Sequence, residues 1–135
     1  MSVLVDTSAW VEFIRNSGTP THREVRNLLS ARDGFSVTGP IIMEVTAGAN
    51  DDLHAESLQW LFSDADKARI DLSHYEEAAA VYRYCRSQGL PVRSMIDCII
   101  AAVALRDDLE LLHSDRDFNA IASVLPLRIH PASAA

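Results

Sequence analysis

Four carboxylates border apolar runs of this chain, and their chemistry is the most informative feature of the sequence. They are spread along the chain and are Asp6, Glu44, Asp97 and Asp115. A carboxylate at the edge of a hydrophobic core must be paired, hydrogen-bonded or bound to a cation, because burying an isolated charge costs much free energy. Four such residues predict that the fold gathers negative charge at one place. A cluster of carboxylates is suited to binding a hard divalent cation such as Mg²⁺ or Mn²⁺.

Taken alone, the acids other than Glu44 also have a structural interpretation. Asp6 can cap a helix after a strand, Asp97 stands where a capping carboxylate would lie, and Asp115 can be an N-cap. Asp117 would face solvent in the first turn of the next helix. Glu44 has no such role, because it interrupts an apolar run inside an expected helix. The case for a site therefore rests on the conjunction of these acids.

Other kinds of site are poorly represented in the sequence. The two cysteines, Cys85 and Cys98, lack the spacing of a zinc or redox motif, and the five histidines lack ligand spacing. His113 lies close to one of the four acids, but we interpret it as a structural residue. No Ser-His-Asp or Cys-His set is recognisable, which disfavours a covalent mechanism.

Length and charge limit the classes of protein to which the chain can belong. Its 135 residues predict a single domain over residues 1–130, followed by a loose tail over residues 131–135. No apolar run is long enough to cross a membrane and no signal peptide is recognisable, so we expect a cytoplasmic protein. The net charge of −7 argues against nucleic-acid binding by charge alone, an objection that bound divalent cations would weaken.

Alternating strands and helices are expected to position the acids. The expected strands are residues 3–5, 34–37, 68–72, 110–113 and 125–129, and the expected helices are residues 9–15, 21–32, 40–48, 53–62, 73–87, 95–106 and 115–122. Two pairs, Thr21 with Glu24 and Ser73 with Glu76, have the spacing of a capping box. The alternation predicts an α/β fold with a parallel sheet covered on both faces. Ligands of such folds bind at the carboxyl ends of the strands, where the acids can meet.

Four stretches of the chain resemble the motifs of PIN-domain nucleases, in the family's order. They are Val5-Asp6-Thr7-Ser8-Ala9-Trp10, Pro40-Ile41-Ile42-Met43-Glu44-Val45, Arg93-Ser94-Met95-Ile96-Asp97-Cys98-Ile99-Ile100-Ala101-Ala102 and Leu112-His113-Ser114-Asp115-Arg116-Asp117-Phe118. At this length the chain most resembles VapC toxins. The resemblance implies a PIN-like three-layer fold, in which a short, mostly parallel central sheet is flanked by helices.

The same resemblance implies a metal-dependent endoribonuclease. One or two Mg²⁺ or Mn²⁺ ions would activate water for attack on a phosphodiester of structured RNA, such as a tRNA or a ribosomal RNA loop. The implied catalytic residues are Asp6, Glu44, Asp97 and Asp115. The implied metal ligands are Asp6, Asp97, Asp115 and, as an auxiliary ligand, Asp117. Thr7 and Ser8 would support this shell, and Arg93 is a candidate RNA contact.

The resemblance also implies partners. A VapB-type antitoxin would neutralise the enzyme, which would form a homodimer and a larger toxin–antitoxin assembly. Operator DNA would be bound only through the antitoxin, and no membrane would be involved.

Two other classes of function compete with this interpretation. A non-catalytic module could keep the fold and use its acidic groove to bind a basic peptide. An aspartyl-phosphate receiver or phosphatase also places an Asp after a strand, but such proteins carry a second acid nearby. Here Thr7 and Ser8 follow Asp6, which disfavours that second alternative.

Overall fold

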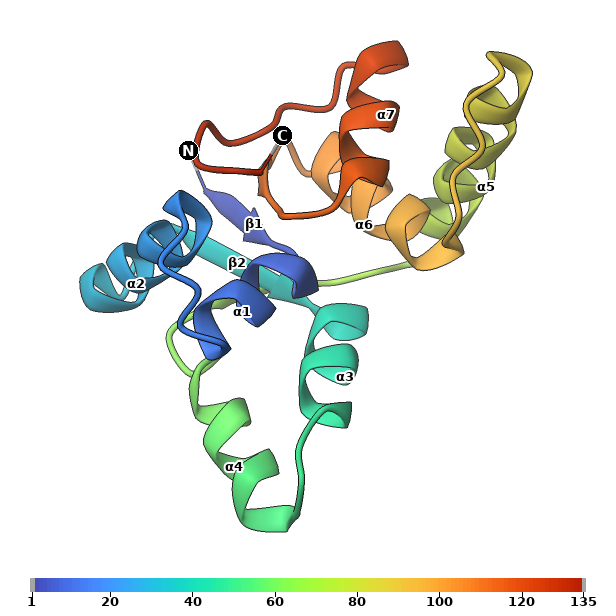
Figure 1. Ribbon diagram of the computed structural model, residues 1–135. Helices are drawn as coiled ribbons and strands as arrows, with labels where there is room; N and C mark the ends of the chain where they lie inside the picture. The colour runs from blue at the N-terminus through green and yellow to red at the C-terminus, as the bar shows by residue number, and fades with distance from the viewer. Residues whose placement is uncertain (1, 135) are drawn as a thin grey trace.

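A four-stranded parallel sheet forms the centre of the computed structural model, which describes residues 2–134 (Figure 1). In space its strands follow the order β3-β2-β1-β4. Their bounds are β1 Val3–Val5, β2 Phe35–Thr38, β3 Asp66–Ala68 and β4 Glu110–Leu112. The two central strands, β1 and β2, are buried along their whole length; β1 is continuously apolar, whereas β2 also buries the polar residues Ser36 and Thr38.

The register of the sheet brings the ends of β1 and β4 together. Val3 pairs with Phe35 of β2 on one side and with Glu110 of β4 on the other. Just beyond the end of β1, the backbone N–H of Asp6 donates to the carbonyl oxygen of Leu112 at 3.0 Å. The residues that follow β1 and β4 therefore leave the same edge of the sheet.

Seven helices are found in the described part of the chain. They are α1 Thr7–Ile14, α2 Pro20–Ala31, α3 Gly39–Ala47, α4 Asp52–Trp60, α5 Leu72–Ser87, α6 Met95–Arg106 and α7 Arg116–Val124. Figure 1 shows α5, α6 and α7 grouped on one side of the sheet and α1 to α4 on the other. This three-layer α/β architecture confirms the predicted fold class. None of the helices within residues 2–134 is long and apolar enough to span a membrane.

A buried aromatic residue fixes α1 against the sheet. Trp10 is fully buried, and its indole Nε1–H donates to the carbonyl oxygen of Val5 at 3.1 Å. Its ring also contacts the rings of Phe35 and Phe62, with centroids 6.2 and 5.1 Å away. Because α1 is anchored to the end of β1, the turn between them, which contains Asp6, has a fixed geometry.

Two of the expected strands were wrong. The strand predicted over residues 68–72 lies instead at Asp66–Ala68, because α5 already begins at Leu72. The strand predicted over residues 125–129 is reduced to a single bridge between Leu111 and Ile129. Pro126 explains the second error, since proline lacks the N–H that a ladder hydrogen bond needs.

Both predicted capping boxes were also wrong, by about two residues each. Helix α2 is capped by Thr19, whose hydroxyl accepts from the N–H of His22. Helix α5 is capped by Asp71, and the box is completed by the side chain of His74 rather than by Glu76. In both cases an upstream polar residue with extended backbone took the cap position.

The end of the chain, expected to be loose, makes specific hydrogen bonds. The hydroxyl of Thr21 donates to the carbonyl oxygen of Ala132 at 2.6 Å, and the N–H of His113 donates to the hydroxyl of Ser133 at 3.1 Å. The N–H of Ala134 donates to the carbonyl oxygen of His113 at 3.0 Å. Residues 132–134 are thus held beside the end of β4, while Ala135 lies outside the described residues.

Candidate active site

Asp6 lies at the carboxyl end of β1, where it caps α1. It is almost fully buried, and its Oδ2 accepts from the backbone N–H of Ser8 at 2.9 Å and from the Ser8 hydroxyl at 2.6 Å. Burial raises the pKa of Asp6 to about 6, although the two bonds from Ser8 act in the opposite direction. The nearby charge of Glu44 raises this pKa further. Ionisation of Asp6 at neutral pH therefore costs free energy, because its buried surroundings favour the protonated carboxyl group.

Asp97 lies in the first turn of α6, directly before the buried apolar residues 98–104 of the same helix. Burial is the largest cause that raises the pKa of Asp97, to about 8. The charges of four other acids raise it as well, and they are Asp115, Asp6, Asp117 and Glu44. Five acids from four separate segments of the chain thus lie close enough to act on one carboxyl group.

The start of α7 supplies the next two acids. Asp115 is the N-cap, and its Oδ1 accepts from the N–H of Asp117 at 2.9 Å. Asp117 was predicted to face solvent, and this is wrong, since it is buried. The reason is a charged partner from a distant segment: the Nε–H of Arg93 donates to Oδ1 of Asp117 at 3.2 Å.

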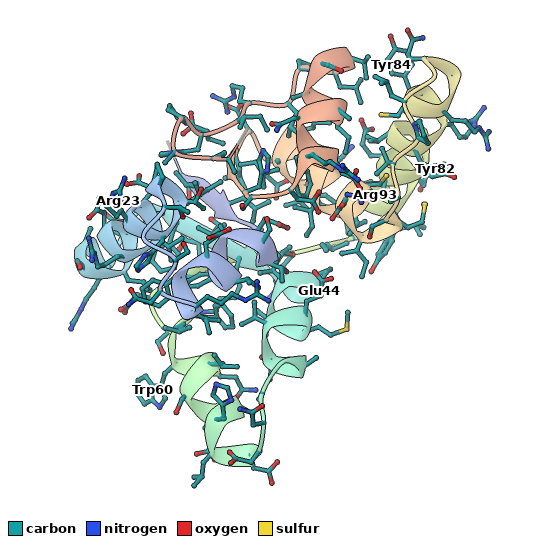
Figure 2. The ribbon with its side chains drawn as sticks, viewed as in Figure 1. Arg23, Glu44, Trp60, Tyr82, Tyr84 and Arg93 are labelled. Carbon is teal, nitrogen blue, oxygen red and sulfur yellow. The ribbon has the colours of Figure 1, made fainter. Side chains whose placement is uncertain are left out.

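Glu44 reaches the site from the opposite side. It is an exposed residue of α3, and its Oε1 accepts from the hydroxyl of Thr7 at 2.8 Å. Figure 2 shows Glu44 on α3 and Arg93 near the start of α7, so that the two residues come to the site from different layers of the fold. Thr7 and Ser8 therefore each donate a hydroxyl to one of the acids.

Three of the acids are close enough together to hold one metal ion. Asp97, Asp115 and Asp117 each offer a carboxylate oxygen, and these oxygens all lie within 4.8 Å of one another. Asp6 and Glu44 stand outside this group. An all-oxygen set of carboxylates suits a hard cation such as Mg²⁺ or Mn²⁺ better than Zn²⁺, which prefers sulfur and nitrogen ligands. The residues present fit such an ion.

Comparison with known proteins agrees with this geometry. Residues 3–124 match the PIN domain family. The chain belongs to this family. It is 39% identical over 128 residues to Ribonuclease VapC11 of Mycobacterium tuberculosis, covering 93% of this chain and 96% of that protein. The same figures hold for VapC ribonuclease Mb1587 of Mycobacterium bovis. Within the family, the chain is therefore one of the VapC ribonucleases.

A solved structure has the same fold. The crystal structure of VapBC2 from Rickettsia felis, bound to a DNA fragment from their promoter, matches with a TM-score of 0.76 at 13% identity, covering 96% of this chain and 98% of that one. At this low identity the likeness concerns the fold alone. Membership of the PIN-domain family disfavours the alternative of an aspartyl-phosphate receiver.

Two residues that contribute to the hydrogen bonds around the acids of this PIN domain, Ser114 and Glu12, were not predicted from the sequence. The backbone N–H of Ser114 donates to the hydroxyl of Ser8 at 2.8 Å, which in turn donates to Asp6. The hydroxyl of Ser114 donates to Oε1 of Glu12 at 3.1 Å. These bonds join segments more than 100 residues apart. The only local signal was that Glu12 follows Ser8 by one helical turn.

His113 has the structural role expected for it. It is fully buried, and its ring contacts that of Phe118 with centroids 5.2 Å apart. Its Nδ1 accepts the backbone N–H of Asp115 at 3.0 Å. Burial lowers the pKa of this imidazole, which favours the neutral ring that can accept such a bond. His113 therefore helps to orient the turn that carries Asp115.

Proposed function

We propose that this VapC ribonuclease is a toxin that cleaves a phosphodiester in structured RNA with the help of one or two Mg²⁺ or Mn²⁺ ions. The observation that carries the proposal is the meeting of Asp97, Asp115 and Asp117, whose carboxylate oxygens lie within 4.8 Å of one another, while burial and the charges of its acidic neighbours raise the pKa of Asp97 to about 8. A protein gains nothing in stability from crowding five acids at one edge of its sheet. A bound divalent cation would offset that cost.

Asp97, Asp115 and Asp117 would hold the ion, with Asp6 completing the ligand set from the end of β1. When bound, the ion supplies charge compensation for the scissile phosphate and Lewis acidity toward the attacking water.

The chain's own residues orient the reacting groups. Ser8 fixes the carboxylate of Asp6, and the N–H of Ser114 fixes the hydroxyl of Ser8. Thr7 holds one oxygen of Glu44 at the exposed rim of the site. From this position Glu44 would accept a hydrogen bond from the attacking water and so align it. Thr7 and Ser8 are positioning residues in this scheme.

Arg93 is the proposed contact for the RNA backbone. Its side chain is 59% exposed although it touches the acidic cluster. A guanidinium group matches the geometry of a phosphate and can donate two parallel hydrogen bonds to it. Such a contact would help an acidic protein to hold RNA next to its carboxylates.

The relatives support a specific biological setting. We propose that a VapB-type antitoxin neutralises this chain, and that homodimers join with antitoxin into a larger assembly that binds operator DNA through the antitoxin. The R. felis structure, which shares the fold, is of VapBC2 bound to a DNA fragment from their promoter. A tRNA or a ribosomal RNA loop is the proposed class of substrate.

Cleavage of structured RNA by the purified chain tests the proposal. We expect cleavage in Mg²⁺ or Mn²⁺, none in excess EDTA, and recovery when the metal is restored, with Ca²⁺ a poor substitute. Undiminished cleavage in EDTA would refute the metal requirement. Metal binding without any cleavage would instead favour the acidic-groove binding module.

A further inference from the structure

A cation of the chain's own lies in the acidic cluster. The Nε–H of Arg93 donates to Oδ1 of Asp117 at 3.2 Å, and Nη2 lies 3.6 Å from Oδ1 of Asp115. Both carboxylates belong to the group of three that can hold one metal ion, the third being Asp97. A guanidinium and a divalent cation would therefore draw on the same two carboxylates.

The backbone and the side chain of Arg93 are held in different ways. Val92, just before it, is buried, and the backbone N–H of Arg93 donates to Oδ2 of Asp117 at 3.3 Å. The side chain is 59% exposed, whereas that of Asp117 is only 9% exposed. The guanidinium can consequently move into solvent while the backbone bond keeps Asp117 in place.

The ion pairs of Arg93 partly balance the negative charge of the acidic cluster. Asp97 is surrounded by four other acids, and the ion pairs to Asp115 and Asp117 within the described residues both come from Arg93. A positive charge at this distance reduces the repulsion between the acids when no metal is present. The same charge also repels an incoming divalent cation.

We propose that Arg93 is the resident counterion of this site: it pairs with Asp115 and Asp117 in the metal-free protein, is displaced when a divalent cation binds, and thereby sets the metal affinity. The inference rests on the proposed function in one respect, namely that the cluster binds Mg²⁺ or Mn²⁺. Its consequence is that metal loading and the release of Arg93 toward RNA are one coupled event.

The proposal is tested by measuring the affinity of the purified chain for Mn²⁺ by isothermal titration calorimetry, without RNA. We expect Arg93→Gln to bind Mn²⁺ more tightly than the wild type, by on the order of tenfold, because a repelling charge is removed. Arg93→Lys keeps the charge and should stay close to the wild-type affinity. Arg83→Gln is the matched control, since Arg83 is an exposed arginine on α5 that makes none of these contacts.

Thermal unfolding supplies a second readout. Without metal, Arg93→Gln should melt at a lower temperature than the wild type, because the acids have lost their counterion. Saturating Mn²⁺ should narrow this difference. Arg83→Gln should show neither effect.

Nuclear magnetic resonance of the wild type removes any dependence on the folding of a variant. The Nε–H resonance of Arg93, assigned by its loss in Arg93→Lys, should move toward the position of exposed arginines as diamagnetic Mg²⁺ is added. A resonance that stays in place at saturating Mg²⁺ would overturn the proposal.

The outcomes separate this inference from the proposed function. If the wild type and Arg93→Gln bind Mn²⁺ with equal affinity, or the variant binds it more weakly, the counterion role is refuted while the metal site stands. If neither the wild type nor any variant binds Mn²⁺ or Mg²⁺, both proposals fail together.

Discussion

The two halves of the acidic edge hold their carboxylates by different means. On the side of β1 and α1, hydroxyl groups hold the carboxylates by hydrogen bonds: Ser8 donates to Asp6, and Thr7 donates to Glu44. On the side of α7, Asp117 is held by the charged side chain of Arg93. In this hydroxyl half, the donor to Asp6 is an uncharged hydroxyl from a residue two positions away in the sequence. In the ionic half, the donor to Asp117 is a charged guanidinium from a residue 24 positions away.

This difference has consequences for charge. Two donors from Ser8 do not compensate the burial of Asp6, whose pKa remains raised, at about 6. Neutral dipoles orient a carboxylate but leave its negative charge in place, ready to attract a metal ion. A guanidinium orients a carboxylate and also cancels its charge. The hydroxyl half thus keeps its negative charge beside the site, whereas the ionic half, whose Asp115 and Asp117 belong to the group that can hold a metal ion, is suited to regulating how readily that ion enters.

Asp97 lies between the two halves, so its substitution should have the largest effect. We expect Asp97→Asn to reduce RNA cleavage by at least about 100-fold, because metal-ion charge stabilisation is worth several kcal/mol. At pH 9, above the raised pKa of Asp97, the metal-free variant should also melt at a higher temperature than the wild type, because one member of a crowded group has lost its charge. Cleavage rates and thermal melts of both proteins provide the measurement. Full activity with an unchanged melting temperature would contradict the assignment.

The pH dependence of stability should reveal the same crowding. The pKa of Asp97 is raised from 3.8 to about 8 in the folded protein, so the folded state binds this proton more tightly than the unfolded state does. The resulting stabilisation is complete below pH 3.8 and is lost as the pH rises through about 8. Asp6 acts in the same sense, up to a pH of about 6.

We therefore expect the melting temperature of the metal-free chain to fall between pH 5 and pH 9 as these carboxyl groups ionise. Asp97→Asn should flatten the upper part of that curve, and Mg²⁺ should oppose the fall in the wild type. A curve of the same shape in both proteins would show that Asp97 does not titrate in this range.

Salt should distinguish the two halves. Ser8→Ala removes both the hydroxyl that binds Asp6 and the acceptor of the Ser114 N–H, which should cost about 1–3 kcal/mol of stability. Arg93→Gln should cost less, because the lost ion pair is partly exposed. Only the cost of Arg93→Gln should shrink between low and high salt, since salt screens charges near the surface. Denaturant unfolding at two salt concentrations measures both, and Ser30→Ala on the exposed part of α2 is a control for the loss of a hydroxyl.

The acids of the site could be predicted from the sequence more readily than the residues that form hydrogen bonds and ion pairs with them. Asp6, Glu44, Asp97 and Asp115 could be found because each interrupts or borders an apolar run, a pattern that needs no knowledge of the fold. The buried state of Asp117 could not be found, because it depends on Arg93, which is distant along the chain. The link from Ser114 to Ser8 was hidden for the same reason.

The fold shows a similar division. The buried strands β1 and β4 and the helix α6 are strongly apolar, and all three were predicted close to their observed bounds. The edge strand β3 is exposed at Asp66 and Lys67, so it carries no apolar signal and its position was wrong. Helix caps were displaced because several polar residues compete for each cap, and tertiary contacts decide between them.

The smallest effect should come from the exposed end of the hydroxyl half. Thr7→Val removes the donor to Glu44 and keeps the shape of the side chain. Because Glu44 is exposed, water can replace the lost hydrogen bond, and stability should change by no more than about 0.5 kcal/mol. Cleavage should nevertheless fall, by a factor of roughly 3 to 10, if Glu44 must be oriented to align the attacking water. Thr7→Ser, which keeps the hydroxyl, should restore most of the activity. Activity of Thr7→Val equal to that of the wild type would mean that Glu44 needs no such support, and the hydroxyl half would then be reduced to Ser8 and Asp6.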